Sequence, residues 1–259
     1  ISQLSYSQNY DVIYKATFKP DKTDKTYTEE DQFMLSIRGN QSLYYSVSYL
    51  MMMANQAEAK KKNIDINKIS SNYFIDKKSD KLLHRQVVGR QLMEYEDNAL
   101  PKWKISNEYK VIDSMKCKKA STHFRGRDYI AWFSEEIAIP EGPYKFKNAP
   151  GLIVAIESKD GDYQYQLVSL KKSENPIPPI PNGVLLKDRK QYIDQLKKLA
   201  ENPSYEMQQQ DQARNTQQKD YVQGKEVSQA EKYKLFNEFV WSFMKKHNNP
   251  IETDDIWIR

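Results

Sequence analysis

The stretch STHFRGRDYIAWFSEEIAIPEGPYKFKNAPGLIVAI, residues 121–156, concentrates the aromatic, charged and turn-forming residues of this 259-residue chain. An Arg-Gly-Arg, a Trp, two adjacent carboxylates, a Gly-Pro and a Pro-Gly lie there between two strand-like runs. Pro fixes φ and Gly admits positive φ, so EGPY (141–144) and NAPG (148–151) predict a loop with two rigid corners. Such corners either shape the fold or present a recognition surface.

On both sides of this stretch, apolar and polar side chains alternate with the two-residue period of half-buried strands. Asp160-Gly161 joins two such runs, which is a strong hairpin signal. Many consecutive strands with short connections predict antiparallel pairing, because parallel pairing needs long crossovers. The expected strands cover residues 10–18, 32–38, 43–47, 72–75, 81–88, 91–95, 103–112, 115–124, 128–133, 152–157 and 163–170.

The composition changes at NPIPPIP (175–181), where four prolines in seven residues stop the sheet and favour an extended connector. We therefore expect a single domain with three parts. Residues 1–174 form a β-rich body with one inserted helix near 49–62, residues 175–186 form the connector, and residues 187–259 form a helical part that packs on the sheet.

The strongest helical pattern lies at 228–247, where Ser228 can cap the helix with Glu231 at the reciprocal position. Its apolar residues recur at spacings of three and four, which predicts a helix that covers an open face of the sheet. The alternative is a helix that binds a partner. A second helix is expected at 187–200, and the glutamine-rich residues 208–218 are either helical or disordered. The recurring apolar residues of the helix at 228–247, which form its apolar stripe, are Tyr233, Phe236, Phe239, Val240, Phe243 and Met244.

Strands first and helices last predict an α+β fold. Because a sheet of eight or more strands tends to curl, we expect a large twisted antiparallel β-sheet. This sheet would form a partial, open barrel, closed by the C-terminal helices. Its shape would resemble the lipoprotein-carrier type of open barrel.

The composition excludes several classes of protein. No window approaches eighteen consecutive apolar residues, so no transmembrane helix is expected. The net charge of +5 comes mostly from scattered lysines without a nucleic-acid reader motif, so nucleic acid is not an expected partner. Cys117, the only cysteine, excludes an intrachain disulfide. The start at Ile1, without Met or an apolar leader, predicts a mature form that has lost a signal peptide.

The titratable residues do not form a recognisable catalytic or metal-binding motif. The three histidines and the cysteine lack the short spacings of zinc sites, and no nucleotide-binding or nucleophile-elbow motif occurs. We therefore predict no metal and no cofactor. The enzyme alternative is a hydrolase that uses Asp128, His123 and Glu135, and it requires these three to converge in one cleft.

Arg125 and Arg127 are one residue apart and so share a strand face. Two guanidinium groups placed in this way can grip a carboxylate or a phosphate. The alternative, which we favour, is that both arginines are paired inside the fold. The expected internal partners are Glu135, Glu136, Glu141 and Asp128.

These residues resemble the GLPGLI family, a group of secreted proteins found mainly in Bacteroidota. The resemblance is carried by KCKKASTHFRGRDYIAW (116–132), AWFSEEIAIPEGPYKFKNAPGLI (131–153), WKI (103–105) and HNNPIE (247–252). In the motif that names the family, this chain has Asn148-Ala149 in place of Gly-Leu and keeps the following PGLI (150–153). If the first Gly of relatives takes a positive φ, Asn is the next-best residue for that position. Ala149 has less apolar surface than the Leu of relatives, so we expect a weaker apolar contact at this position in this chain.

The resemblance implies export to the periplasm or outer membrane, companionship with outer-membrane machinery and no established enzymatic activity. We therefore expect an exported, non-catalytic accessory protein that docks on an outer-membrane protein, such as a TonB-dependent transporter. One alternative is a carrier of a lipid or peptide, which predicts a large apolar pocket between sheet and helices; the other is the hydrolase. The candidate ligand- or partner-binding residues are Arg125, Arg127, Asp128, Trp132, Glu135, Gly142, Pro143, Tyr144, Pro150 and Gly151.

Overall fold

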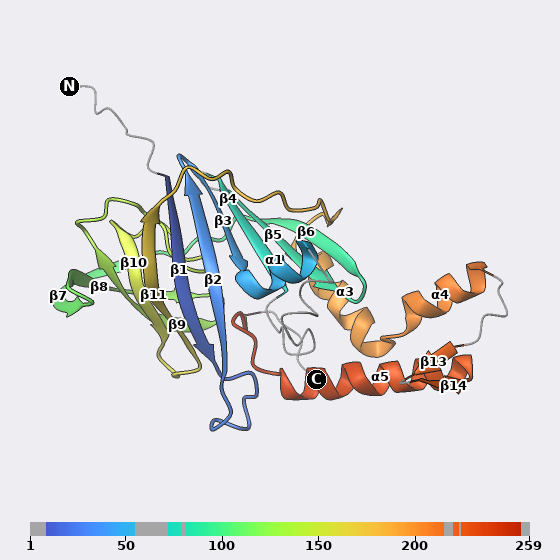
Figure 1. The fold of residues 1–259 in the computed structure, drawn as a ribbon. Coiled ribbons are helices and arrows are strands. Elements are labelled where there is room, and N and C mark those ends of the chain that lie inside the picture. Colours follow the sequence, from blue (N-terminus) through green and yellow to red (C-terminus); the bar gives the residue numbers. More distant parts are fainter. Residues whose placement is uncertain (1–8, 55–71, 79–80, 215–219, 223, 255–259) are drawn as a thin grey trace.

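The computed structural model describes residues 9–54, 72–78, 81–214, 220–222 and 224–254. Most of this part of the chain is one open β-sheet with an α+β fold, as the sequence predicts (Figure 1). Its strands are β1 (Asn9–Phe18), β2 (Glu29–Arg38), β3 (Gln41–Ser46), β4 (Tyr73–Lys78), β5 (Lys81–Val88), β6 (Gln91–Asp97), β7 (Lys104–Ile112), β8 (Met115–Phe124), β9 (Arg127–Ser134), β10 (Leu152–Ser158), β11 (Tyr163–Lys172) and β12 (Val184–Leu185). Their order in the sheet is β12-β6-β5-β4-β3-β2-β1-β11-β10-β9-β8-β7.

Two antiparallel meanders, β1 to β6 and β7 to β11, are joined where β1 pairs with β11. The predicted hairpin at Asp160-Gly161 is confirmed, since Gly161 takes a φ of 70° between β10 and β11. The sheet is not entirely antiparallel, because β12 runs parallel to β6. The proline-rich segment before β12 supplies the crossover that this parallel pairing needs. Part of that segment is packed: Ile177 and Ile180 lie against the cluster of Leu43 and Phe74.

Helices and a small hairpin follow the sheet. Asp188 caps α3 by accepting from the backbone N–H of Gln191. Ser228 caps α5 by accepting from the backbone N–H of Glu231, as predicted. Residues 55–62 of the helix expected near 49–62, and residues 215–218 of the glutamine-rich segment, lie outside the described residues. The elements are α1 (Val47–Ala54), α3 (Arg189–Glu201), α4 (Tyr205–Arg214), β13 (Asp220–Val222), β14 (Lys225–Val227) and α5 (Gln229–Lys246).

The apolar stripe of α5 does not cover the sheet, contrary to our expectation. No residue of α5 is buried, and Phe239 is 57% exposed. In Figure 1, α4, α5 and the β13–β14 hairpin extend away from the sheet. Part of the inner face of the sheet is covered instead by the loop between β9 and β10, which places Tyr144, Phe146 and Ala149 in the main core. Of the C-terminal helices, α3 is the one that packs on the sheet, through Tyr192 and Ile193 against β5 and β6.

The loop between β9 and β10 has the two rigid corners that EGPY and NAPG predict, and they shape the fold. Asn148 takes a φ of 65°, the conformation expected of the residue that replaces Gly. Phe146 is fully buried against the rings of Tyr129 and Phe124, at 4.7 and 5.8 Å between centroids. Burial of such a side chain stabilises the fold by about 2–3 kcal/mol.

None of the helices in the described part of the chain combines the length and apolar character that a bilayer-spanning helix requires.

Candidate ligand-binding cavity

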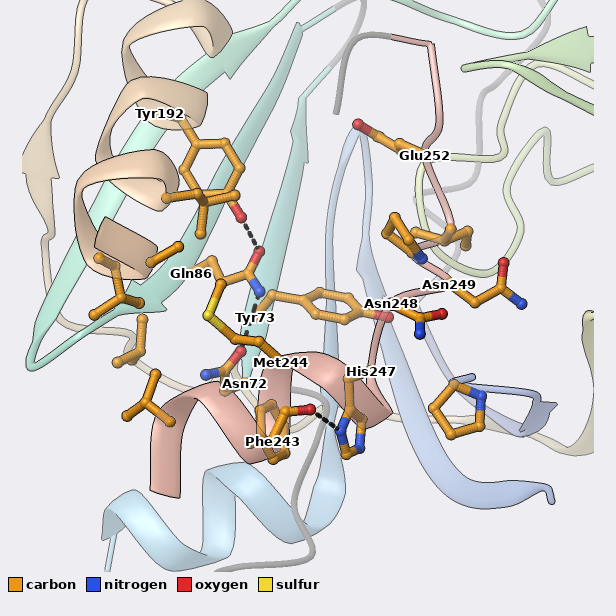
Figure 2. Close-up of a pocket in the computed structure, with 18 of the residues that line it drawn as sticks. Asn72, Tyr73, Gln86, Tyr192, Phe243, Met244, His247, Asn248, Asn249 and Glu252 are labelled. Carbon is orange, nitrogen blue, oxygen red and sulfur yellow. Dashed lines mark hydrogen bonds between the residues drawn. The ribbon is translucent and has the colours of Figure 1, made fainter. Parts of the chain in front are cut away.

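A cavity of about 990 Å³ lies between the inner face of the sheet, α3, α5 and the segment at 247–252 that follows α5. Figure 2 shows Tyr192 from α3 on one side of it, His247 to Glu252 on the other, and Tyr73 reaching between them. The cavity therefore occupies the place where the sequence expects α5 to pack on the sheet.

One wall of the cavity is formed by helices and is apolar. Leu196 and Leu199 come from α3, and Phe236, Val240 and Met244 come from the stripe of α5. These α5 side chains recur every three or four residues, so they lie on one side of the helix. The stripe that the sequence predicts thus faces a cavity.

The opposite wall is formed by the sheet and is rich in tyrosine. Its hydroxyl and amide groups bond mostly to one another: Tyr192 donates to Gln86 Oε1 at 2.6 Å, and Gln86 Nε2 donates to Asn72 Oδ1 at 3.2 Å (Figure 2). Tyr163 donates to the carbonyl of Asn249. With these polar groups engaged, the tyrosines present mainly their ring carbons to the cavity.

His84 also lines this wall and is held neutral. It lies between the rings of Tyr73 and Tyr95, at 5.8 and 5.2 Å between centroids, and its Nε2 is 3.2 Å from Gln86 Oε1. Burial, together with the nearby Lys145 ammonium, lowers the pKa of His84 to about 3. The imidazole therefore adds no charge to the cavity at neutral pH.

Glu252 forms the charged floor of the cavity. It accepts hydrogen bonds from Lys145 Nζ at 2.6 Å, from the Tyr144 hydroxyl at 2.7 Å and from Arg189 Nε at 3.0 Å. Burial alone would raise the pKa of the Glu252 carboxyl, but Lys145 and Arg189 outweigh burial and hold that pKa well below its usual range. Lys145 is fully buried and also bonds to Asp97 Oδ2 at 2.7 Å. The floor is an ionised network whose charges neutralise one another.

The two arginines of the Arg-Gly-Arg motif are paired inside the fold, but with other partners than we expected. Arg125 pairs with Asp97 and Asp254. Arg127, with a side chain only 5% exposed, pairs with Asp160 and Asp162. None of the four carboxylates expected from the sequence takes part, because the loop that carries Glu135, Glu136 and Glu141 turns away from this end of the strands.

Arg127→Ala should lower the free energy of unfolding by about 2–3 kcal/mol, because it removes a buried cation that also donates to Asn249 and to the carbonyl of Pro250. The loss is limited because Asp162 keeps its ion pair with Lys25 at 2.6 Å. Urea unfolding followed by circular dichroism measures the change. The exposed Arg90 supplies the control, since Arg90→Ala should alter stability by less than about 0.5 kcal/mol. An unchanged stability of Arg127→Ala would favour a recognition role.

The predicted binding residues do not form one accessible surface. Tyr144 lines the cavity, but Arg127, Gly142, Pro143, Tyr144 and Gly151 are all buried in the fold. Arg125 and Trp132 are partly buried, and Trp132 lies beneath the Lys110 ammonium at 4.3 Å. The exposed members are Asp128, Glu135 and Pro150.

The three residues of the hydrolase alternative do not converge. His123 Nδ1 lies 2.9 Å from Asp128 Oδ1, but both side chains are more than half exposed. Glu135 follows the other end of β9 and pairs with Lys118 instead. Seven residues of strand separate Asp128 from Glu135 by roughly 23 Å. Within the described residues, no group of three or more His, Cys, Asp or Glu side chains could hold a metal ion.

The residues of the cavity could not be found from local spacing. Glu252 and Asn249 belong to HNNPIE, a stretch that the family resemblance includes, yet their partners Lys145 and Arg127 lie 107 and 122 residues away in the sequence. The local signals of the helical wall were the apolar stripe of α5 and the helical period that predicts a helix at 187–200, which carries Leu196 and Leu199.

Comparison with solved structures shows a similar fold in PNGF-II, in two space groups. The TM-scores are 0.54 and 0.51, with 16% sequence identity in both cases. The match covers 74% of this chain but only 34% and 33% of the other, so this chain spans about a third of the length of those structures. At this identity the likeness shows the fold alone. No family model matches the chain, and no curated protein does.

Proposed function

We propose that this chain is a non-catalytic binding protein that carries an apolar ligand, of the lipid or peptide type, in the cavity between the sheet and α5. The observation that carries the proposal is the size and lining of the cavity. Its volume of about 990 Å³ matches the upper range of ligand-binding pockets in proteins. Its walls consist mainly of leucine, phenylalanine, methionine and the ring faces of tyrosine, and the polar groups among them, such as Gln86 and Glu252, are bonded to other residues of the protein.

The exposed state of α5 supports the same function. A helix with a wide apolar stripe normally buries that stripe, whereas Phe239 and Phe243 of the α5 stripe are 57% and 37% exposed. Each Å² of apolar surface that a ligand removes from water contributes about 25 cal/mol. An apolar ligand would therefore supply the burial that α5 lacks.

Export to the periplasm or outer membrane, and docking on an outer-membrane protein such as a TonB-dependent transporter, remain predictions from the sequence resemblance. They are compatible with a carrier, because a ligand held in a cavity has to be received from or handed to a partner.

Titration with N-phenyl-1-naphthylamine, a neutral apolar fluorophore, tests the proposal. We expect saturable binding that Val240→Lys weakens tenfold or more, because the substitution puts a charge in the apolar wall. Since α5 has no buried residue, the variant should keep its fold. Ser242→Lys is the matched control, because it adds the same charge to an exposed site of the same helix outside the lining. Absence of saturable binding to the unmodified protein would refute the proposal.

A further inference from the structure

The cavity offers a peptide backbone few hydrogen-bond partners. The sheet wall is built from side chains of β1, β2, β4, β5, β6 and β11, and each of these strands already pairs with a neighbour on either side. The side chains of Asn248 and Asn249 are bonded to Asp21, Lys19 and Asp162. A buried peptide would therefore leave several of its amide groups without partners, which is costly. A hydrocarbon chain makes no such demand.

Three of the tyrosine hydroxyls of the lining are engaged as well. Tyr144 donates to Glu252, Tyr192 donates to Gln86, and Tyr163 donates to the carbonyl of Asn249. The two walls thus present carbon on both sides of the space, from Phe and Leu side chains on one and from tyrosine rings on the other. This lining is suited to a long, unbranched apolar chain.

Ionised groups of the lining are compensated except at one point. Glu252 is neutralised by Lys145 and Arg189. His247 Nε2 lies 3.0 Å from Glu29 Oε1, so these two polar groups of the lining and its surroundings face each other. Lys245, in the last turn of α5, is exposed at the rim of the cavity, and within the described part of the chain its ammonium has no ion-pair partner. Among the described residues that line the cavity, Lys245 is therefore the one charged side chain without an ion-pair partner.

We infer that the ligand is a single long-chain carboxylate, of the fatty-acid type, whose chain lies between α5 and the tyrosine wall and whose carboxylate pairs with Lys245. This inference rests on the proposed function and adds the chemical class of the ligand. An ion pair at an exposed rim contributes about threefold to fivefold in affinity, so the apolar chain supplies most of the binding.

Displacement of N-phenyl-1-naphthylamine by oleate, monoolein and oleylamine tests the inference, with all three kept below their aggregation concentrations. We expect oleate to displace the fluorophore best, and Lys245→Glu to weaken oleate about tenfold while leaving monoolein unchanged. Lys246→Glu is the matched control, since it alters the neighbouring charge outside the lining and should leave both affinities unchanged.

Other outcomes overturn the inference in distinguishable ways. Three results would rule out a carboxylate ligand and leave the proposed carrier function standing. They are equal displacement by the three lipids, preference for oleylamine, and equal effects of the two lysine substitutions. Displacement by a blocked apolar tripeptide but not by oleate would favour a peptide ligand. If the fluorophore itself does not bind, the proposed function fails and the inference fails with it.

Discussion

Glu252→Gln is expected to lower the free energy of unfolding by about 3–5 kcal/mol. The Gln side chain has nearly the same shape as Glu but no charge, so Lys145 and Arg189 would remain buried with one fewer counter-charge. Lys145 is fully buried and cannot recover its solvation by moving into water without opening the core. Removing one partner of a buried ion pair is among the most destabilising single substitutions.

Urea unfolding at neutral pH measures this loss, and Asp254→Asn provides a matched control. Asp254 also contacts Arg125 and Arg189, at 3.2 Å in both cases, but its side chain is 34% exposed. Water can solvate the two arginines when the Asp254 carboxylate is lost, so Asp254→Asn should lower the free energy of unfolding by less than about 1 kcal/mol. Similar losses for the two variants would contradict the role assigned to Glu252.

The pH dependence of the same comparison gives a second readout. The pKa of Glu252 is held well below its ordinary value of 4.5, so its contribution is complete above about pH 4.5. As the pH falls below that value, the unfolded state takes up a proton that the folded state resists, and the contribution declines. The stability difference between Glu252→Gln and the unmodified protein should therefore shrink in acid.

Local sequence patterns predict those parts of the fold that depend on neighbouring residues. Alternation located the strands, Asp160-Gly161 located a hairpin, and the spacing of Ser228 and Glu231 located the start of α5. The positive φ of Asn148 followed from its place in the motif. In each case the physical cause lies within a few residues of the chain.

The cavity depends on contacts between distant segments, which local patterns do not contain. The spacing of the apolar residues of α5 predicts that Phe236 and Val240 share one face of the helix. It does not predict whether that face packs on the sheet or lines a cavity, as it does here. Glu252 reads as an ordinary surface carboxylate, because only the folded chain brings Lys145 to it across 107 residues. For the same reason, the expected partners of Arg125 and Arg127 were wrong, since nearness in sequence was used in place of nearness in space.

Gly151→Ala is expected to destabilise the protein by about 3 kcal/mol or more, because the added methyl group has no room. A Cβ at this position would lie 2.0 Å from the carbonyl oxygen and 2.8 Å from the carbonyl carbon of Ser134, both backbone atoms. The strand cannot shift easily. Leu152 N–H donates to Ile137 O at 3.0 Å, and the buried Tyr14 hydroxyl donates to Ile153 O at 2.7 Å. Glycine is therefore required here for the close approach of β9 and β10.

Thermal unfolding of Gly151→Ala beside Gly161→Ala separates this steric cause from the general preference of turns for glycine. Gly161 has a φ of 70°, but its Cβ would meet only the flexible Lys19 Nζ, at 3.9 Å, so Ala there should cost about 1–2 kcal/mol. For a chain of this size, the corresponding decreases in melting temperature are about 6–12 °C for Gly151→Ala and about 2–8 °C for Gly161→Ala. If Gly151→Ala did not fold while Gly161→Ala folded normally, the result would also support the steric clash at position 151. Equal melting temperatures would show instead that β9 and β10 can separate at little cost, and the glycine of the PGLI stretch would then have to be explained by recognition.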